Sequence, residues 1–145
     1  MKLERSCGLL LHITSLPGSY GAGSLGDEAY RFADFLVNSG QQYWQILPHN
    51  PVCAHLGYSP YLSPSTFAGN PLFISLEKLA QKKWVPAGII PDDPFSANDD
   101  FANFKDREAL LLSTLRNLFS VFLHHASEDE LSDFNKFCDE ESWWL

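Results

Sequence analysis

A strand–helix–strand pattern over residues 8–47 constrains the fold more strongly than any other feature of this sequence. Residues 8–13 are a nearly continuous apolar run, which predicts a fully buried strand of a parallel sheet. Residues 43–47 predict a second strand. Between them, residues 27–39 predict an amphipathic helix, because apolar side chains recur at helical spacing. These side chains are Ala29, Phe32, Ala33 and Leu36. Two parallel strands joined by a helix form a right-handed βαβ unit, so we expect an α/β fold.

Local signals mark both ends of the predicted helix. Ser24 begins a segment that resembles a capping box. Asp27 and Glu28 place acidic groups in the first turn, where the helix dipole favours negative charge. Gly40 can adopt the left-handed conformation in which helices commonly end. We therefore expect Ser24 to cap this helix and Gly40 to stop it.

The sequence beyond residue 76 predicts helices in place of strands. Residues 75–84 predict a short helix with Ser75 as its cap, and the three prolines of residues 86–94 predict a linker. Residues 101–126 predict a long helix, because large side chains repeat in helical register. The repeating side chains are Phe101, Phe104, Ala109, Leu112, Leu115, Phe119 and Phe122.

A last helix is predicted to begin at Ser127 and to reach about residue 141, with Leu131, Phe134 and Phe137 along one face. We thus expect residues 1–76 to form the βαβ unit with its loops and residues 77–145 to form a mainly helical subdomain. The large apolar residues 143–145 indicate that the sequence breaks off where a further helix begins.

A long connection over residues 49–71 follows the second strand. Its second part, residues 57–71, which we call the aromatic loop, holds three prolines, two glycines and two tyrosines. Proline fixes φ and glycine allows positive φ, so this composition predicts an ordered loop rather than a helix or a strand. Aromatic rings between hydroxyl groups suit an uncharged, hydroxyl-rich ligand. The alternative is a proline-rich surface loop without a ligand.

Composition excludes several functions. The chain has 10 basic and 18 acidic residues and a net charge of −8, which disfavours nucleic-acid binding. No apolar run is long enough for a membrane span, and no secretory signal is visible, so we expect a cytoplasmic protein. The three cysteines lack CxxC or zinc-ligand spacing, which predicts free thiols in a reducing compartment and no metal site. They are Cys7, Cys53 and Cys138.

Few side chains in this sequence are placed for catalysis. His12 follows the first strand, where it could contact a substrate or hold a loop through hydrogen bonds, and we favour the second interpretation. His124 and His125 are adjacent on a helix and so point to different faces. The acidic runs, such as Asp92-Asp93 and Asp99-Asp100, lie in linkers and at helix ends, where we expect them to be solvated or capping.

Three motifs in order carry a family resemblance. Residues 10–18 read LLHITSLPG, and residues 43–48 read YWQILP. Residues 59–61 read SPY, followed by FAGNP at residues 67–71. In this order and spacing the motifs resemble the amylomaltases, the 4-alpha-glucanotransferases of glycoside hydrolase family 77.

This resemblance implies a fold and an activity. It implies that the chain is the amino-terminal portion of a (β/α)8 TIM-type barrel, containing the first βαβ unit. The implied enzyme transfers segments of an α-1,4-glucan or maltooligosaccharide to the 4-hydroxyl of another sugar by a retaining double displacement, without a cofactor. Such chemistry needs two carboxyl groups about 5–5.5 Å apart. In the family these groups lie on later strands, so no catalytic residue is expected in residues 1–145.

The resemblance also implies which residues bind substrate. Tyr61 matches the tyrosine that lines the sugar subsite next to the cleaved bond, and Ser59 belongs to the same motif. Three positions depart from the family pattern, namely Tyr58 and Leu62 on either side of Ser-Pro-Tyr, and Leu56 in place of a sugar-stacking tyrosine. The alternative function is a stand-alone, non-catalytic module that binds glucan or another protein. The oligomeric state stays open.

Overall fold

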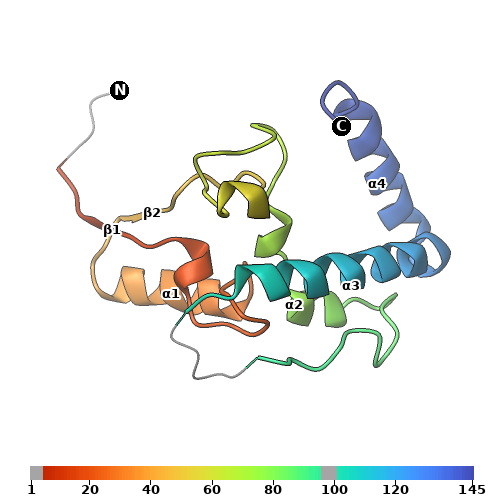
Figure 1. Ribbon diagram of the computed structural model, residues 1–145, viewed down its shortest axis with the longest axis horizontal. Helices are drawn as coiled ribbons and strands as arrows, with labels where there is room; N and C mark the ends of the chain where they lie inside the picture. Colours follow the sequence, from red (N-terminus) through yellow and green to blue (C-terminus); the bar gives the residue numbers. More distant parts are fainter. Residues whose placement is uncertain (1–4, 96–100) are drawn as a thin grey trace.

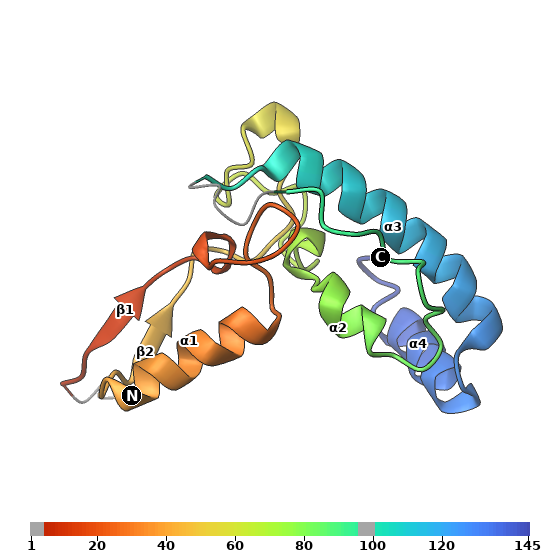
Figure 2. The same ribbon diagram turned by 90° about the horizontal axis from the view of Figure 1, so that it is seen from below.

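The computed structural model describes residues 5–95 and 101–145. In chain order the strands and α-helices are β1 Gly8–Leu10, α1 Asp27–Asn38, β2 Tyr43–Gln45, α2 Leu76–Ala80, α3 Phe104–His125 and α4 Glu128–Glu140 (Figure 1). Three short 3-10 helices lie in the connections, at η1 Ile13–Ser15, η2 Ala54–Leu56 and η3 Pro71–Phe73. Figure 2 shows β1, β2 and α1 on one side of the molecule and α2, α3 and α4 on the other, joined through the loops.

The predicted βαβ unit is confirmed. β1 and β2 pair in parallel, with Gly8 opposite Tyr43. A Cβ on Gly8 would lie only 2.4 Å from the Tyr43 carbonyl oxygen, so the pairing requires glycine here. Helix α1 covers the sheet through Phe32, whose ring contacts the Trp44 ring edge to face at 4.9 Å.

The predicted burial of the first strand is wrong. Leu9 and Leu10 are 41% and 58% exposed, and strand geometry ends at Leu10 rather than at Ile13. In the described residues the sheet has two strands, so each strand keeps one free edge and a largely uncovered face. A parallel strand is buried only when neighbouring strands and helices on both faces cover it.

Of the two end signals predicted for α1, the structure confirms one. Gly40 adopts φ +72° after the last turn, as expected for a helix stop. At the other end the N-cap is Gly26, and no side chain caps the helix, so the prediction for Ser24 is wrong. The backbone of Gly26 packs against Ser75, since a Cβ on Gly26 would lie 3.0 Å from the Ser75 Oγ. The N-cap thus lies two residues beyond Ser24, and the helix itself begins at Asp27, as predicted.

The helices of the second half begin at side-chain caps. The Ser75 hydroxyl accepts a hydrogen bond from the Lys78 amide, as predicted. Ser127 and Glu130 form a complete capping box at the start of α4. Helix α3 begins at Phe104 because the Asn103 side chain accepts from the Asp106 amide. Phe101, predicted to lie in this helix, therefore precedes it.

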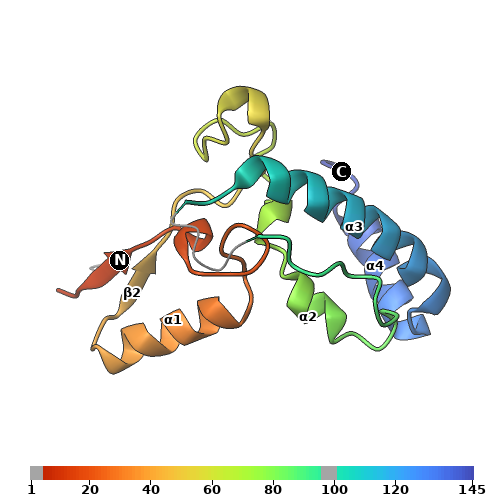
Figure 3. The same ribbon diagram turned by 60° about the horizontal axis from the view of Figure 1, so that its bottom comes forward.

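The hydrophobic core lies where the loop before α1 meets η3, α2 and α3 (Figure 3). Its buried members are Tyr20, Leu72, Leu76 and Leu111. Along α3, Leu111 belongs to this core and Leu115 packs against it, whereas Phe119 and Phe122 contact Phe134 of α4. The core thus takes side chains from both sides of the division expected after residue 76, and that division stays a prediction.

Candidate functional site

The aromatic loop, residues 57–71, is an ordered segment whose two ends are anchored. It leaves η2 through Gly57 and Tyr58, which both adopt positive φ, at +64° and +56°. At the other end Asn70 is buried, and its backbone amide donates to the His49 carbonyl at 2.9 Å. The Asn70 side chain accepts from the Leu72 amide at 3.0 Å. The bond to His49 therefore closes the long connection of residues 49–71 next to η3.

Tyr58 fixes the near end of the aromatic loop to α3. Its ring stacks on Phe104 with 5.4 Å between centroids, and its hydroxyl donates to Glu108 at 2.9 Å. Burial, and then the nearby Glu108 carboxylate, raise the pKa of the Tyr58 phenol. The structure thus gives Tyr58 an anchoring role on the helical half of the molecule.

Tyr61 is presented to solvent from the tip of the loop. Its side chain is 70% exposed, and its backbone amide points to the Ser59 hydroxyl at 3.4 Å. The described residues show no contact between this motif and His12, so the structure does not bring the three predicted substrate-binding residues together. An exposed aromatic ring on an anchored backbone is the arrangement that sugar stacking requires.

His12 lies immediately before η1 at the carboxyl end of β1. Its ring meets Phe73 edge to face at 5.4 Å. Its Nδ1 atom is buried without a hydrogen-bond partner among the described residues. Burial lowers the pKa of His12, which favours the neutral imidazole. The hydrogen bond through which His12 could hold a loop is thus absent at Nδ1, and the contact with Phe73 takes its place.

Arg107 of α3 joins the loop before α1 to η3 at the core. The sequence did not predict this role. The side chain is 1% exposed, and its Nη1 donates to the carbonyl oxygens of Ser19 and Tyr20 at 3.1 and 2.9 Å. Its Nε and Nη2 donate to the Leu72 carbonyl. Burial lowers the pKa of Arg107, against the opposing charges of Glu77 and Asp93. An arginine in a helix usually lies on the solvated face, so no sequence pattern distinguishes this one.

The loop before α1 is also held from the linker of residues 86–94. Tyr20 has φ +61°, and its amide donates to Asp93 Oδ2 at 2.9 Å. The Tyr20 hydroxyl donates to the Pro91 carbonyl at 3.0 Å. Asp93 was expected to be solvated or capping, and it instead ties two distant segments together, 73 residues apart. Asp99 and Asp100 lie outside the described residues.

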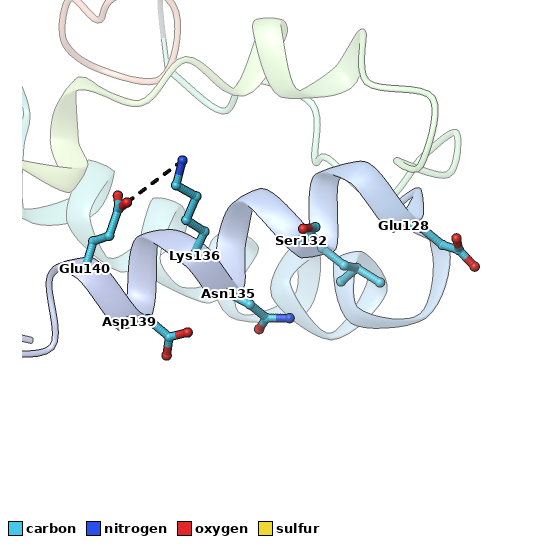
Figure 4. A pocket seen from close by; sticks show the side chains of 7 residues that line it. Glu128, Ser132, Asn135, Lys136, Asp139 and Glu140 are labelled. Carbon is cyan, nitrogen blue, oxygen red and sulfur yellow. Dashed lines mark ion pairs between the residues drawn. The ribbon is translucent and has the colours of Figure 1, made fainter.

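Hollows on the surface differ in their suitability as binding sites. One apolar hollow lies beside the closed end of the aromatic loop, with Ile13, Ile46, His49, Asn70 and Phe73 among its lining residues. Another follows one face of α4, where Lys136 and Glu140 form an ion pair at 3.9 Å (Figure 4). Because this second hollow is built from a single helix face and its side chains project outward, it offers no enclosed site.

The described part of the chain contains neither a metal-binding cluster nor a membrane-spanning helix. Residues 5–95 and 101–145 hold no group of three or more His, Cys, Asp or Glu side chains placed for a metal ion. Within the same ranges, no helix combines the length and apolar character needed to cross a membrane. The three cysteines are free thiols, as predicted.

Comparison with known proteins identifies the class to which this arrangement belongs. The structure is similar to an amylomaltase from Streptococcus agalactiae solved in complex with acarbose. The TM-score is 0.76 at 34% identity, over 97% of this chain and 28% of that one. The βαβ unit with its anchored aromatic loop is therefore of the amylomaltase class. The sequence profile of glycoside hydrolase family 77, described as 4-alpha-glucanotransferase, matches residues 11–145. The chain belongs to this family.

Comparison with curated relatives shows how much of their length this chain spans. The 4-alpha-glucanotransferase of Thermus thermophilus is 42% identical over 149 aligned residues, which cover 100% of this chain and 28% of the relative. That of Streptococcus pneumoniae is 39% identical, over 98% of this chain and 27% of the relative. The chloroplastic enzyme of Solanum tuberosum is 31% identical over 97% of this chain. The chain thus spans about a quarter of the length of these relatives.

Proposed function

We propose that this chain is the amino-terminal, substrate-binding part of a cytoplasmic 4-alpha-glucanotransferase, and that the aromatic loop binds an α-1,4-glucan. The observation that carries the proposal is Tyr61, whose exposed ring stands in the Ser-Pro-Tyr motif of a loop anchored at both ends. Family membership supports the activity, and the acarbose complex of the Streptococcus agalactiae amylomaltase supports a sugar ligand. The whole enzyme transfers a glycosyl group to a sugar hydroxyl.

The chemical step requires groups beyond the described residues. A retaining transfer uses one carboxylate as nucleophile and one carboxylic acid as proton donor to the leaving oxygen. The covalent glycosyl intermediate divides one difficult displacement into two easier ones. In this proposal the carboxyl pair follows residue 145 and residues 1–145 orient the sugar. The proposed fold of the whole enzyme is a (β/α)8 barrel that starts with β1 and β2, with residues 1–76 as barrel and 77–145 as helical subdomain.

The alternative of a stand-alone binding module has less support. Similarity extends along the entire chain to enzymes of which it spans about 28%. A module that had evolved for another role would not need the family's Ser-Pro-Tyr motif, nor the closing turn at Asn70.

The proposal is tested by titrating the chain with acarbose and following tryptophan fluorescence. Tyr61→Ala should weaken binding about tenfold, because an aromatic contact of this kind contributes about 0.5–1.5 kcal/mol beyond burial. Tyr30→Ala is the matched control, since Tyr30 is 66% exposed, lies on α1 rather than in the aromatic loop, and carries the Lys78 ammonium group over its ring. Failure of the unmodified chain to bind acarbose would overturn the proposal, as would equal affinities of the two variants.

A further inference from the structure

The far end of the chain touches the aromatic loop. The Trp143 ring, three residues after α4 ends at Glu140, meets the Phe67 ring edge to face with 4.6 Å between centroids. The Trp144 ring lies 6.5 Å from Phe67 and contacts Phe137 of α4 at 6.4 Å. In Figure 1 the end of the chain lies on the side of α4 that faces the loop. Aromatic packing thus joins Phe67 and Trp143, which are 76 positions apart in the sequence.

Ring contacts join the tip of the aromatic loop, residues 59–68, to the end of the chain. Within the described residues, the hydrogen bonds of residues 59–68 are all local. The amides of Tyr61 and Leu62 donate to the side chain and the carbonyl of Ser59, the Ser59 amide donates to the Leu56 carbonyl, and the others join residues 63–68. The anchors at Tyr58 and Asn70 lie outside this tip. Among the ring contacts of the described residues, those of Phe67 with Trp143 and Trp144 connect residues 59–68 to the segment after α4.

The chain beyond α4 is folded into a turn that presents Trp143. The amides of Trp144 and Leu145 both donate to the Glu141 carbonyl at 3.1 Å. The Trp144 indole N–H donates to the Glu141 side chain. These bonds fix the backbone on the carboxyl side of Trp143, so its ring is offered to the loop by an ordered segment.

We infer that Trp143 is a positioning residue for the aromatic loop, which acts on the glucan through Phe67 and thereby on the placement of Tyr61. This inference rests on the proposed function. Phe67 lies six residues after Tyr61 in the same loop, so freeing Phe67 gives the tip more conformations. Glucan affinity then falls because only part of the population holds Tyr61 in the binding geometry.

The test combines amide hydrogen exchange with acarbose titration of the 145-residue chain. Trp143→Ala should speed exchange of residues 59–68 and weaken acarbose binding, each by about two- to tenfold. Trp143→Phe keeps an aromatic ring and should restore most of both. Trp84→Ala is the matched control, because the Trp84 ring contacts Phe122 at 5.2 Å, away from the loop. It should leave both readouts unchanged.

A second variant separates action through Phe67 from direct sugar contact. In a Phe67→Ala background, adding Trp143→Ala should cause no further loss of affinity, because the two residues act as one unit. Full additivity would overturn the inference, and so would unchanged exchange of residues 59–68 in Trp143→Ala. Acarbose failing to bind the unmodified chain would count against the proposed function, while the exchange data would still decide whether Trp143 holds the loop.

Discussion

The guanidinium of Arg107 donates two hydrogen bonds to the Leu72 carbonyl oxygen, from Nε at 3.2 Å and from Nη2 at 2.8 Å. Arg107 lies on α3 and Leu72 in η3, directly after the aromatic loop, so this pair joins the helical half to the end of the loop. The same side chain reaches the carbonyl oxygens of Ser19 and Tyr20. The buried guanidinium of Arg107 thereby holds the loop before α1 and the end of the aromatic loop in place relative to each other.

Replacing Arg107 should destabilise the fold strongly. Arg107→Met should lower the free energy of unfolding by about 2–4 kcal/mol, because two buried carbonyl groups and a partly buried one lose their donors. Arg107→Lys should fall between the wild type and this variant, since an ammonium group cannot reproduce the planar fork. Urea denaturation measures the difference. Equal stability of wild type and Arg107→Met would show that the hydrogen bonds contribute nothing net.

Removing one hydroxyl should loosen the near end of the aromatic loop. Tyr58→Phe keeps the stacking on Phe104 but loses the hydrogen bond to Glu108, which we expect to cost about 1 kcal/mol. Hydrogen exchange around residues 57–59 should rise accordingly. Glu108→Gln provides the paired variant, because its amide can still accept the hydrogen bond. An exchange pattern that does not distinguish Tyr58→Phe from Glu108→Gln would contradict the anchoring role.

Acid should destabilise the protein partly through His12. Burial lowers the pKa of His12 in the folded state, so below the ordinary value of about 6.5 the unfolded state binds more protons. Stability is then present above this value and is lost as the pH falls toward the folded-state pKa. His12→Gln should flatten the fall in melting temperature between about pH 7 and 5, relative to wild type. His55→Gln, on the exposed surface of η2, is the control, and an identical slope in wild type and His12→Gln would contradict the prediction.

The uncovered sheet should make the isolated chain self-associate. Leu10 is 58% exposed on β1, which also has a free edge in the described structure. Leu10→Gln should raise the monomer fraction measured by sedimentation velocity. Leu62→Gln, at a similarly exposed leucine of the aromatic loop, should change it less. A wild-type chain that stays monomeric across the accessible concentrations would refute this expectation.

Features set by local interactions were predicted well from the sequence. The starts of α2 and α4 follow from Ser75 and Ser127, and the end of α1 follows from Gly40. Each of these signals acts within a few residues along the chain. The start of α1 at Asp27 was predicted, but the cap was not: the N-cap is Gly26 rather than Ser24, and its backbone lies against Ser75, a residue far away in the sequence.

Features set by distant partners could not be predicted. The exposure of Leu9 and Leu10 depends on which strands lie beside β1, and an apolar run carries no information about that. The buried position of Arg107 depends on three carbonyl groups that fold next to α3 from distant loops. At the candidate site, the motif led to Tyr61, whereas Trp143 became evident only from its contact with Phe67.

The chain alone should not catalyse glucan transfer. The sequence places no acidic residue directly after either strand, where a facing pair of carboxyl groups for a retaining mechanism would be expected. Incubation with maltotriose should yield neither glucose nor longer glucans. Turnover that disappears on mutation of an acidic residue within residues 1–145 would contradict this prediction and place catalytic groups in this chain.

The central claim, that Tyr61 contacts the sugar at the reacting centre, is tested most directly by Tyr61→Ala in the complete enzyme. The measurement pairs a thermal melt with kcat/KM on maltotriose. An unchanged melt with kcat/KM lowered about ten- to a hundredfold is expected, which corresponds to a lost contact of about 1.5–3 kcal/mol in the transition state. An unchanged melt with unchanged kinetics would contradict the claim and remove Tyr61 from the site.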